Sequence, residues 1–210
     1  MTMQISRLSY LVKVVIDEVT PSTVEISYND MPIDDRVNSL AESCAKETLL
    51  ASPLRYLPHK DIPGNVEIYG DGSGYVLLPS DFLRLFSFKM ELWKRRVNNS
   101  ITEESESYLL QKNPVTRGGI NFPVCAVVNS EKGLILEWYS VPSYVRMPKC
   151  TEKRYVPIPE ITNSEINIPQ GLEMLMVYIT AKEVLMSLQQ YDMAKATEEL
   201  ILTEMKQLSI

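Results

Sequence analysis

The stretch Tyr75–Val97, YVLLPSDFLRLFSFKMELWKRRV, decides the fold expected of this chain. It opens with a short apolar run, which Pro79 interrupts because proline lacks a backbone N–H and fixes φ. A second run, Leu83–Met90, is apolar at every second position on both faces. One face holds Leu83 and Leu85, and the other holds Phe86, Phe88 and Met90. A strand of this kind is normally covered on both sides, so the stretch predicts a core strand pair at the centre of a β-region.

Two amphipathic helices are predicted before this stretch. The first spans Ser6–Val19, with Ser6 as its N-cap and a row of apolar residues on one face. The second has Asp30 as a candidate cap and ends at Ser52–Pro53. Cys44 lies on the apolar stripe of this second helix, which favours a core position over a reactive thiol.

Two further helices are predicted at the end of the chain. The segment 170–189 contains no proline and is apolar on two stripes, which indicates that it packs against neighbours on both sides. Its candidate packing residues, within the bundle or between subunits, are Leu172, Leu175, Met176, Ile179 and Leu185. Asp192 is the candidate cap of the last helix, and the two helices would form an αα-hairpin.

The middle of the chain predicts hairpins and one short helix. Residues 66–69 and the strand beginning at Tyr75 flank a glycine-rich turn, which lacks the following Lys-Ser/Thr and helix of a phosphate loop. A short helix is expected within 102–113, and strands at 121–129 and 134–141 are expected to form a second hairpin. The Pro-rich segment 142–159 is expected to be an extended arm or an edge strand.

The predicted fold class is therefore α+β, a helical bundle of N- and C-terminal helix pairs with a central inserted antiparallel β-region. Residues 1–55 would form the N-terminal helix pair and 166–210 the C-terminal pair that completes the bundle. The β-rich insertion would span 56–165 and would include the arm at 142–159.

Composition and charge limit the classes of function. The chain has 210 residues, 45% of them hydrophobic and 23% charged, as in ordinary globular proteins. Its net charge of -6 argues against general nucleic-acid binding, which depends on neutralising phosphates. The three cysteines are far apart and form no CxxC pair, which is typical of a reducing compartment. Neither a signal peptide nor a membrane span is predicted.

No residue pattern predicts catalysis, a cofactor or a metal. His59 is the single histidine and lies in a Pro-bounded loop without a recognisable nucleophile. One histidine and three scattered cysteines match no zinc module. Adjacent carboxylates point about 100° apart on a helix, so such pairs do not converge on one proton. The expectation is a protein that is not an enzyme.

One local basic cluster stands out from the acidic balance. Lys94, Arg95 and Arg96 follow directly after Trp93, whose ring could stack on a partner. The cluster could face DNA, an acidic patch on a neighbour, the acidic residues 103–106, or solvent alone. These four residues are the candidate contact site.

Five blocks of sequence carry a resemblance to a known family. In order they are LPSDFLRL (78–85), the run 93–96, SESYLLQKN (105–113), RGGINFPVCAVV (117–128) and GLILEWYS (133–140). They resemble the head-to-tail connector proteins of short-tailed bacteriophages, the adaptor or tail tubular ring proteins. They are most similar to those of the crAss-like phages, which infect gut Bacteroidetes. No block is a catalytic signature.

The resemblance implies a virion structural protein of the portal vertex, made in the host cytoplasm. It would form an adaptor ring, twelvefold in the family, with the portal protein above and the tail or further ring proteins below. DNA would pass through the ring without sequence recognition during genome ejection, and no membrane would be contacted. Family members also have an extended arm, and here no long arm follows the last predicted helix.

Two alternatives remain open from the sequence. The chain could be another ring or a tail-completion protein of the same virion. It could instead be a small-ligand binding module or an enzyme of unknown substrate, with a cleft lined by aromatic residues. The candidate cleft residues are Tyr75, Trp93, Trp138 and Tyr139.

Overall fold

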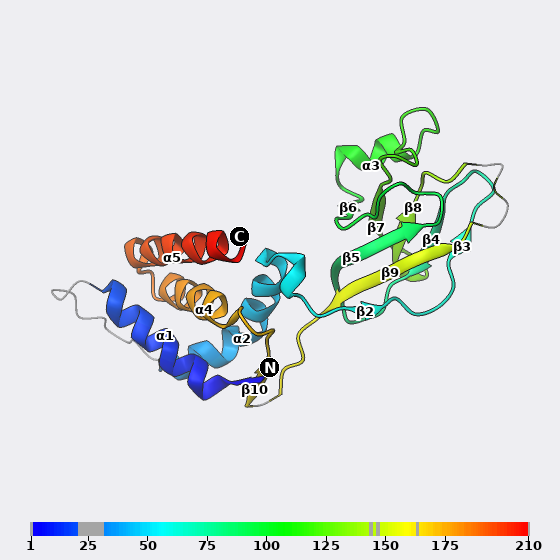
Figure 1. Ribbon diagram of the computed structural model, residues 1–210. Helices are drawn as coiled ribbons and strands as arrows, with labels where there is room; N and C mark the ends of the chain where they lie inside the picture. Colours follow the sequence, from blue (N-terminus) through cyan, green and yellow to red (C-terminus); the bar gives the residue numbers. More distant parts are fainter. Residues whose placement is uncertain (1, 21–31, 143–144, 146–147, 163, 210) are drawn as a thin grey trace. The chain divides into compact units, whose positions relative to one another are not determined.

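The computed structural model describes residues 2–20, 32–142, 145, 148–162 and 164–209. The chain divides into two compact units (Figure 1). We call Met1–Leu57 together with Pro159–Ile210 the helical unit, and Pro58–Ile158 the β unit. Each unit is described by itself below.

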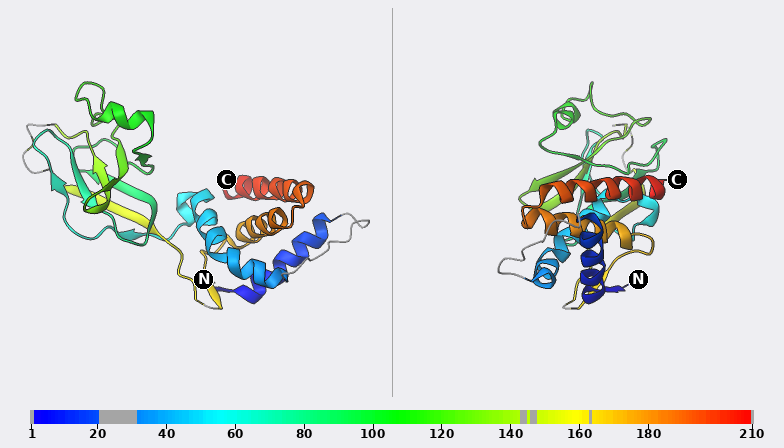
Figure 2. Two further views of the ribbon diagram at one scale, coloured as in Figure 1. Left: turned by 180° about the vertical axis from the view of Figure 1, so that it is seen from behind. Right: turned by 90° about the vertical axis from the view of Figure 1, so that its left-hand side faces the viewer.

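The helical unit is built around helix α4. Its elements are α1 (Ile5–Val19), α2 (Ile33–Ala51), a 3₁₀ turn (Leu54–Tyr56), α4 (Glu173–Ser187) and α5 (Tyr191–Ser209). Helix α4 packs against α1, α2 and α5, and Figures 1 and 2 show it between α5 and the other two helices. Its buried side chains lie on several sides of the helix, which confirms the prediction of a helix with partners on both sides.

A small sheet joins the two chain segments of the helical unit. Strand β1 (Thr2–Gln4) pairs antiparallel with β10 (Glu165–Asn167), and the buried Met3 lies opposite the buried Ile166. The sheet was not predicted, because three-residue strands carry too little pattern to be recognised.

The predicted helix caps differ from the observed helix ends. Ser6 lies inside α1, because the helix already begins at Ile5 with Gln4 at the N-cap position and no side-chain capping bond. Asp192 likewise lies in the first turn of α5, which begins at Tyr191. There its carboxylate is favoured by the helix dipole rather than by capping. The candidate cap Asp30 lies outside the described residues.

The β unit contains two sheets and one short helix. The three-stranded sheet has the order β2-β9-β5, and the five-stranded sheet has the order β3-β4-β8-β7-β6. The strands are β2 (Lys60–Asp61), β3 (Glu67–Ile68), β4 (Gly74–Leu77), β5 (Phe82–Met90), β6 (Ile101–Thr102), β7 (Cys125–Ser130), β8 (Gly133–Trp138) and β9 (Cys150–Pro157). Helix α3 (Glu106–Gln111) follows β6.

The stretch 75–97 supplies one strand to each of the two sheets of the β unit: β4 to the five-stranded sheet and β5 to the three-stranded sheet. Both strands form as predicted, but β4 and β5 do not pair with each other, so the predicted core strand pair is wrong. The Pro79 break, closed by a bond from Phe82 N–H to the Pro79 carbonyl, lets the chain leave one sheet and enter the other. A β-bulge between Leu85 and Ser87 also changes the strict alternation of faces. Leu85 therefore joins Phe88 in one hydrophobic cluster.

Both predicted hairpins are confirmed. Strands β3 and β4 pair antiparallel across the glycine-rich turn, and β7 pairs with β8 across a turn in which Gly133 has φ of 108°. A side chain on Gly74 would overlap both the Glu67 carbonyl and the Trp138 ring, so the β3–β4 hairpin needs glycine there.

Two hydrophobic clusters lie on opposite faces of the five-stranded sheet. Leu136 and Trp138 of β8 belong to the cluster shared with Leu85, Phe88 and Met90 of β5, which lies between the two sheets. Ile135 and Tyr139 belong to the second cluster, to which α3 contributes Tyr108. The alternation along β8 explains why Trp138 and Tyr139 face opposite sides, as the sequence predicted.

The predicted fold class requires correction. The described residues do form an α+β protein, with five α-helices and ten strands, but in three sheets. The β unit is nearly half of the chain and has its own core, so it is larger than an insertion in a helical bundle. It is also not wholly antiparallel, because β6 pairs parallel with β7. Strand pairing over long sequence distances decides these features, and local patterns do not report it.

The segment 142–159 is not an arm over most of its described length. Strand β9 is the central strand of the three-stranded sheet, with β2 on one side and β5 on the other. Tyr155 and Val156 are buried, so the edge-strand alternative is wrong as well. Its prolines flank or end the strand rather than interrupt it, which leaves the ladder intact.

Candidate functional site

The basic cluster lies on an exposed loop that is fixed at both ends. The loop leaves β5 through a bond from Trp93 N–H to the Met90 carbonyl (3.0 Å), and Val97 N–H donates back to the Phe88 carbonyl (2.9 Å). Lys94 N–H donates to the Ile120 carbonyl (2.9 Å), which joins this loop to the segment before β7. The three cationic side chains are therefore exposed on a well-anchored loop.

Trp93 does not share this exposed surface. Its side chain is 2% exposed and packs against Phe88, with the ring centroids 5.8 Å apart. The prediction that Trp93 could stack on a partner is thus wrong for this conformation, because the indole belongs to the core between the sheets. Of the predicted contact site, only the three basic residues are exposed.

A different aromatic residue accompanies the basic loop. Phe122 is 67% exposed, and the Arg95 guanidinium lies 3.9 Å from its ring centroid in a cation–π contact. Arg95 Nε also donates to the Asn121 carbonyl at 2.6 Å. Sequence reasoning missed Phe122, although its place in a Gly- and Pro-flanked segment before β7 was a signal for an exposed aromatic residue.

These residues form one surface, which we call the basic–aromatic patch. It comprises the exposed residues of the loop, Leu92, Lys94, Arg95 and Arg96, together with Phe122, which Arg95 contacts. Among the described residues, no acidic side chain, including the exposed Glu103 and Glu104, forms an ion pair with its three cations. Arginine and aromatic residues are enriched in the residues that contribute most to protein–protein binding.

The predicted packing residues of the C-terminal helices are internal to the helical unit. All of them are at most 1% exposed. They are Leu172, Leu175, Met176, Ile179 and Leu185. They stabilise the packing of α4 with its three neighbours and are not available as a surface between subunits.

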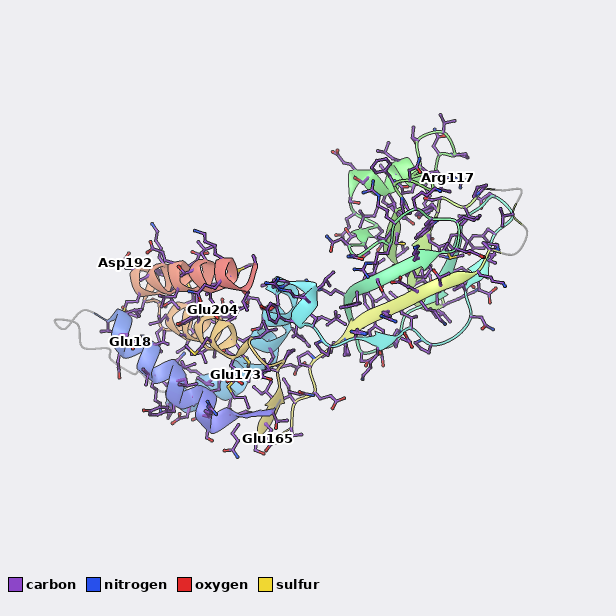
Figure 3. All side chains as sticks on the ribbon, in the orientation of Figure 1. Glu18, Arg117, Glu165, Glu173, Asp192 and Glu204 are labelled. Carbon is purple, nitrogen blue, oxygen red and sulfur yellow. The ribbon has the colours of Figure 1, made fainter. Side chains whose placement is uncertain are left out.

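A polar cluster around Glu137 fastens α3 to the five-stranded sheet. The Glu137 carboxylate accepts hydrogen bonds from the hydroxyls of Tyr108 (3.0 Å) and Tyr139, and Lys112 Nζ lies 3.5 Å away. Burial, and then the neighbouring Glu137, raise the pKa of Tyr139. A small cleft of about 130 Å³ beside the cluster is also lined by Asp71 and Arg117, which form an ion pair at 3.2 Å; Figure 3 labels Arg117. Because its charged groups bind one another, the cluster acts as a structural lock.

The aromatic cleft considered for a small ligand does not form. All four of its residues are buried, and they are divided between the two hydrophobic clusters on opposite faces of the sheet. Trp93 and Trp138 belong to one cluster, and Tyr75 and Tyr139 to the other.

The histidine and the cysteines occupy unremarkable environments. His59 is exposed and stacks on Phe86 with ring centroids 4.3 Å apart. Cys44 and Cys125 are buried, as predicted for Cys44, and burial raises the thiol pKa of Cys44 and of Cys150 to about 11. Thiols with such pKa values are poor nucleophiles at neutral pH. Within the described part of the chain, no three His, Cys, Asp or Glu side chains are grouped to bind a metal ion.

No protein-family model matches the chain, and no curated protein matches it significantly. None of the described helices combines the length and the apolar composition that a membrane span requires.

Proposed function

We propose that this protein is a non-enzymatic structural protein of a short-tailed, crAss-like phage virion, in which it forms the adaptor ring between portal and tail. The ring would surround the DNA exit channel at the portal vertex, with the portal protein on one side and tail or further ring proteins on the other. DNA would pass through it without sequence recognition.

The basic–aromatic patch is the observation that carries this proposal. A phenylalanine that is 67% exposed and contacts an arginine, with two further exposed cations on the same loop, is characteristic of a surface that binds another macromolecule. Four of its five residues, all but Leu92, lie in two of the sequence blocks that resemble connector proteins, at 93–96 and 117–128. The resemblance and the exposed surface therefore meet at the same place in the β unit.

The location of the chain in virions tests the proposal. Purified particles of the source phage would be analysed by mass spectrometry for this chain and by cryo-electron microscopy at the portal vertex. We expect density for this fold as a ring directly below the portal. Absence of the chain from the particles would overturn the proposal.

The same experiment separates the nearest alternative. Density for the fold at a lower level of the tail would identify another ring or a tail-completion protein of the virion. The aromatic cleft on which the small-ligand alternative depended does not form. The cleft beside Glu137 is small, and Glu137 is hydrogen-bonded to Tyr108 and lies near Lys112.

A further inference from the structure

The helical unit contains a polar cleft. Its volume is about 480 Å³, which lies within the range of about 300–1,000 Å³ found for small-molecule sites. The cleft is lined by Ile5 and by six polar residues from β1, from the N-terminal parts of α1 and α2, and from the position before β10. These polar residues are Gln4, Ser6, Ser9, Asp34, Asn38 and Ser164. All of the lining therefore belongs to one unit of the chain.

Hydrogen bonds fix the cleft on two sides. Ile5 N–H donates to the Ser164 carbonyl at 2.8 Å, which attaches the beginning of α1 to the segment before β10. Figure 3 labels the residue that follows, Glu165. On the side of α2, the Asp34 carboxylate accepts a hydrogen bond from the Ser9 hydroxyl. The cleft is thus formed before any ligand binds, as is usual for small-molecule sites.

The charge of the cleft lining is balanced. Asp34 is the charged residue of the lining, and Lys13 Nζ lies 2.8 Å from its carboxylate. Lys13, and then the Ser9 hydroxyl, hold the pKa of Asp34 below its usual range, so the carboxylate is ionised at neutral pH. Because Lys13 balances this charge, the cleft suits neither an anion nor a metal ion. A carboxylate with a lowered pKa is also a weak base, which leaves Ser9 without activation as a nucleophile.

Ser9 is held as a hydrogen-bond acceptor. Its side chain is buried, with 5% exposed, and its hydroxyl proton is donated to Asp34. The lone pairs of the Ser9 oxygen remain available to a ligand. A hydroxyl that donates to a carboxylate is also a stronger acceptor, because the two hydrogen bonds polarise each other. Ser9 therefore favours a ligand that presents a hydroxyl or an amide proton.

The other polar side chains of the cleft both donate and accept. Gln4 and Asn38 each contribute a carboxamide, and Ser6 and Ser164 each contribute a hydroxyl. All four are exposed, and none of their side chains is hydrogen-bonded to another described residue. Neighbouring hydroxyls of a sugar or a cyclic polyol use this combination of donors and acceptors, because each hydroxyl can do both.

An exposed aromatic ring lies on the same face of α1 as part of the cleft. Tyr10 is 66% exposed and follows Ser6 by about one helical turn, which brings the two side chains to the same face. A sugar ring is polar at its hydroxyls and apolar on its C–H face, so it can contact an aromatic ring and polar side chains together.

We propose that this cleft binds a neutral polyhydroxylated small molecule, a sugar or a cyclic polyol, whose hydroxyls bind Ser9, Asn38 and Gln4. An apolar ligand fits poorly, because Ile5 is the apolar residue of the lining and the other six are polar. The proposal goes beyond the function proposed above and does not rest on it, because the cleft shares no residue with the basic–aromatic patch.

Nuclear magnetic resonance of the isotope-labelled, full-length chain tests the proposal. The probes are D-glucose, D-galactose, D-mannose, N-acetyl-D-glucosamine and myo-inositol, each titrated to about 50 mM. We expect at least one probe to bind with a Kd of about 1–10 mM and to shift the amide signals of Ser9 and Asn38 most strongly. If no probe binds in this range, or if the shifted signals lie outside the cleft, the proposal is overturned.

Two single substitutions locate the binding. Ser9→Ala removes the buried acceptor and leaves the ion pair of Asp34 with Lys13, and Asn38→Ala removes an exposed carboxamide. Each should weaken the binding of the same probe about tenfold, because each removes hydrogen bonds to the ligand. Asn38 is exposed, so its substitution keeps the test decisive even if Ser9→Ala does not fold. Wild-type affinity in Asn38→Ala overturns the proposal.

Matched substitutions outside the cleft control for general effects. Ser39→Ala removes an exposed hydroxyl of α2, and Gln207→Ala removes an exposed carboxamide of α5. Both should bind the probe with wild-type affinity, and circular dichroism should show that they are folded. Equal weakening by either control would show that the probe does not bind at the cleft, and would overturn the proposal.

Discussion

In the helical unit one apolar helix, α4, contacts three neighbours, whereas in the β unit a five-stranded sheet separates two hydrophobic clusters. The helical core needs only the correct pattern on each helix, because helices form from contacts near in sequence. The β core needs strands from distant parts of the chain, such as β5 with β9 and β4 with β8. The first kind of core is visible in the sequence, and the second is visible only once the strands are paired.

The two units also differ in where their charged side chains lie. Among the described residues, most carboxylates of the helical unit lie at exposed positions of its helices, whereas the β unit has three exposed cations in succession on one loop. Each unit also has its own core, on which its stability depends. The predictions below test whether the two units are as independent as this comparison indicates.

The largest effect is expected from the central aromatic residue of the β unit. Trp138 is fully buried between the two sheets, so Trp138→Ala should cost about 3–5 kcal/mol of unfolding free energy. Fluorescence of Trp93, which reports on the β unit alone, should show unfolding at a lower urea concentration. Far-ultraviolet circular dichroism, dominated by the helices of the other unit, should change little at that concentration. Phe122→Ala, at an exposed position, is the control, and its unfolding free energy should stay within about 0.5 kcal/mol of that of the wild type. Simultaneous loss of both signals would show that the units unfold together.

The corresponding change in the helical unit is Leu175→Ala. Leu175 is fully buried on α4, so its truncation should cost about 2–5 kcal/mol, measured by urea unfolding with far-ultraviolet circular dichroism. Met174, its neighbour on the same helix, is 37% exposed, and Met174→Ala should stay within about 0.5 kcal/mol. Equal costs for the two variants would contradict the orientation of α4.

A smaller effect concerns the polar lock and depends on pH. Burial raises the pKa of Tyr139, so its neutral phenol is favoured in the folded β unit. The unfolded chain ionises this phenol near pH 10, and the stability it contributes is therefore complete below about pH 10 and lost as pH rises further. Tyr139→Phe should be about 1 kcal/mol less stable at neutral pH, from the lost hydrogen bond, and should show a flatter decline between about pH 9 and 11.

Urea titrations followed by tryptophan fluorescence measure this decline. Tyr69→Phe, at a half-exposed position of the same unit, is the control and should keep the slope of the wild type. An unchanged slope for Tyr139→Phe would show that another group causes the alkaline loss of stability.

The smallest effect separates the predicted helix start from the observed one. A serine N-cap contributes about 1 kcal/mol, so Ser6→Ala would be clearly destabilising if Ser6 capped the first helix. Because Ser6 lies inside α1 and is exposed, we expect a change within about 0.5 kcal/mol in thermal or urea unfolding. A loss of unfolding free energy near 1 kcal/mol would show that Ser6 caps the helix after all.

The basic–aromatic patch shows how far sequence reasoning reached at the candidate site. The three cations were identified because a charge run is visible in the sequence and chains rarely bury it. The aromatic partner was assigned to the adjacent Trp93 rather than to Phe122, which lies more than twenty residues away. Adjacency in sequence does not determine which side of a loop faces the core. The bond between Lys94 and Ile120 brings the second segment to the site.

The sequence by itself determined the α+β composition, the positions of the four long helices, both hairpins and the apolar helix α4. Each depends on periodicity, turn residues or proline breaks, which act over a few residues. Only the tertiary structure decided that β4 and β5 enter different sheets, that β9 lies at the centre of one of them, and that Phe122 rather than Trp93 accompanies the basic loop. These features depend on pairing and packing between distant segments, where many registers satisfy the same local pattern and the collective burial of the core selects one.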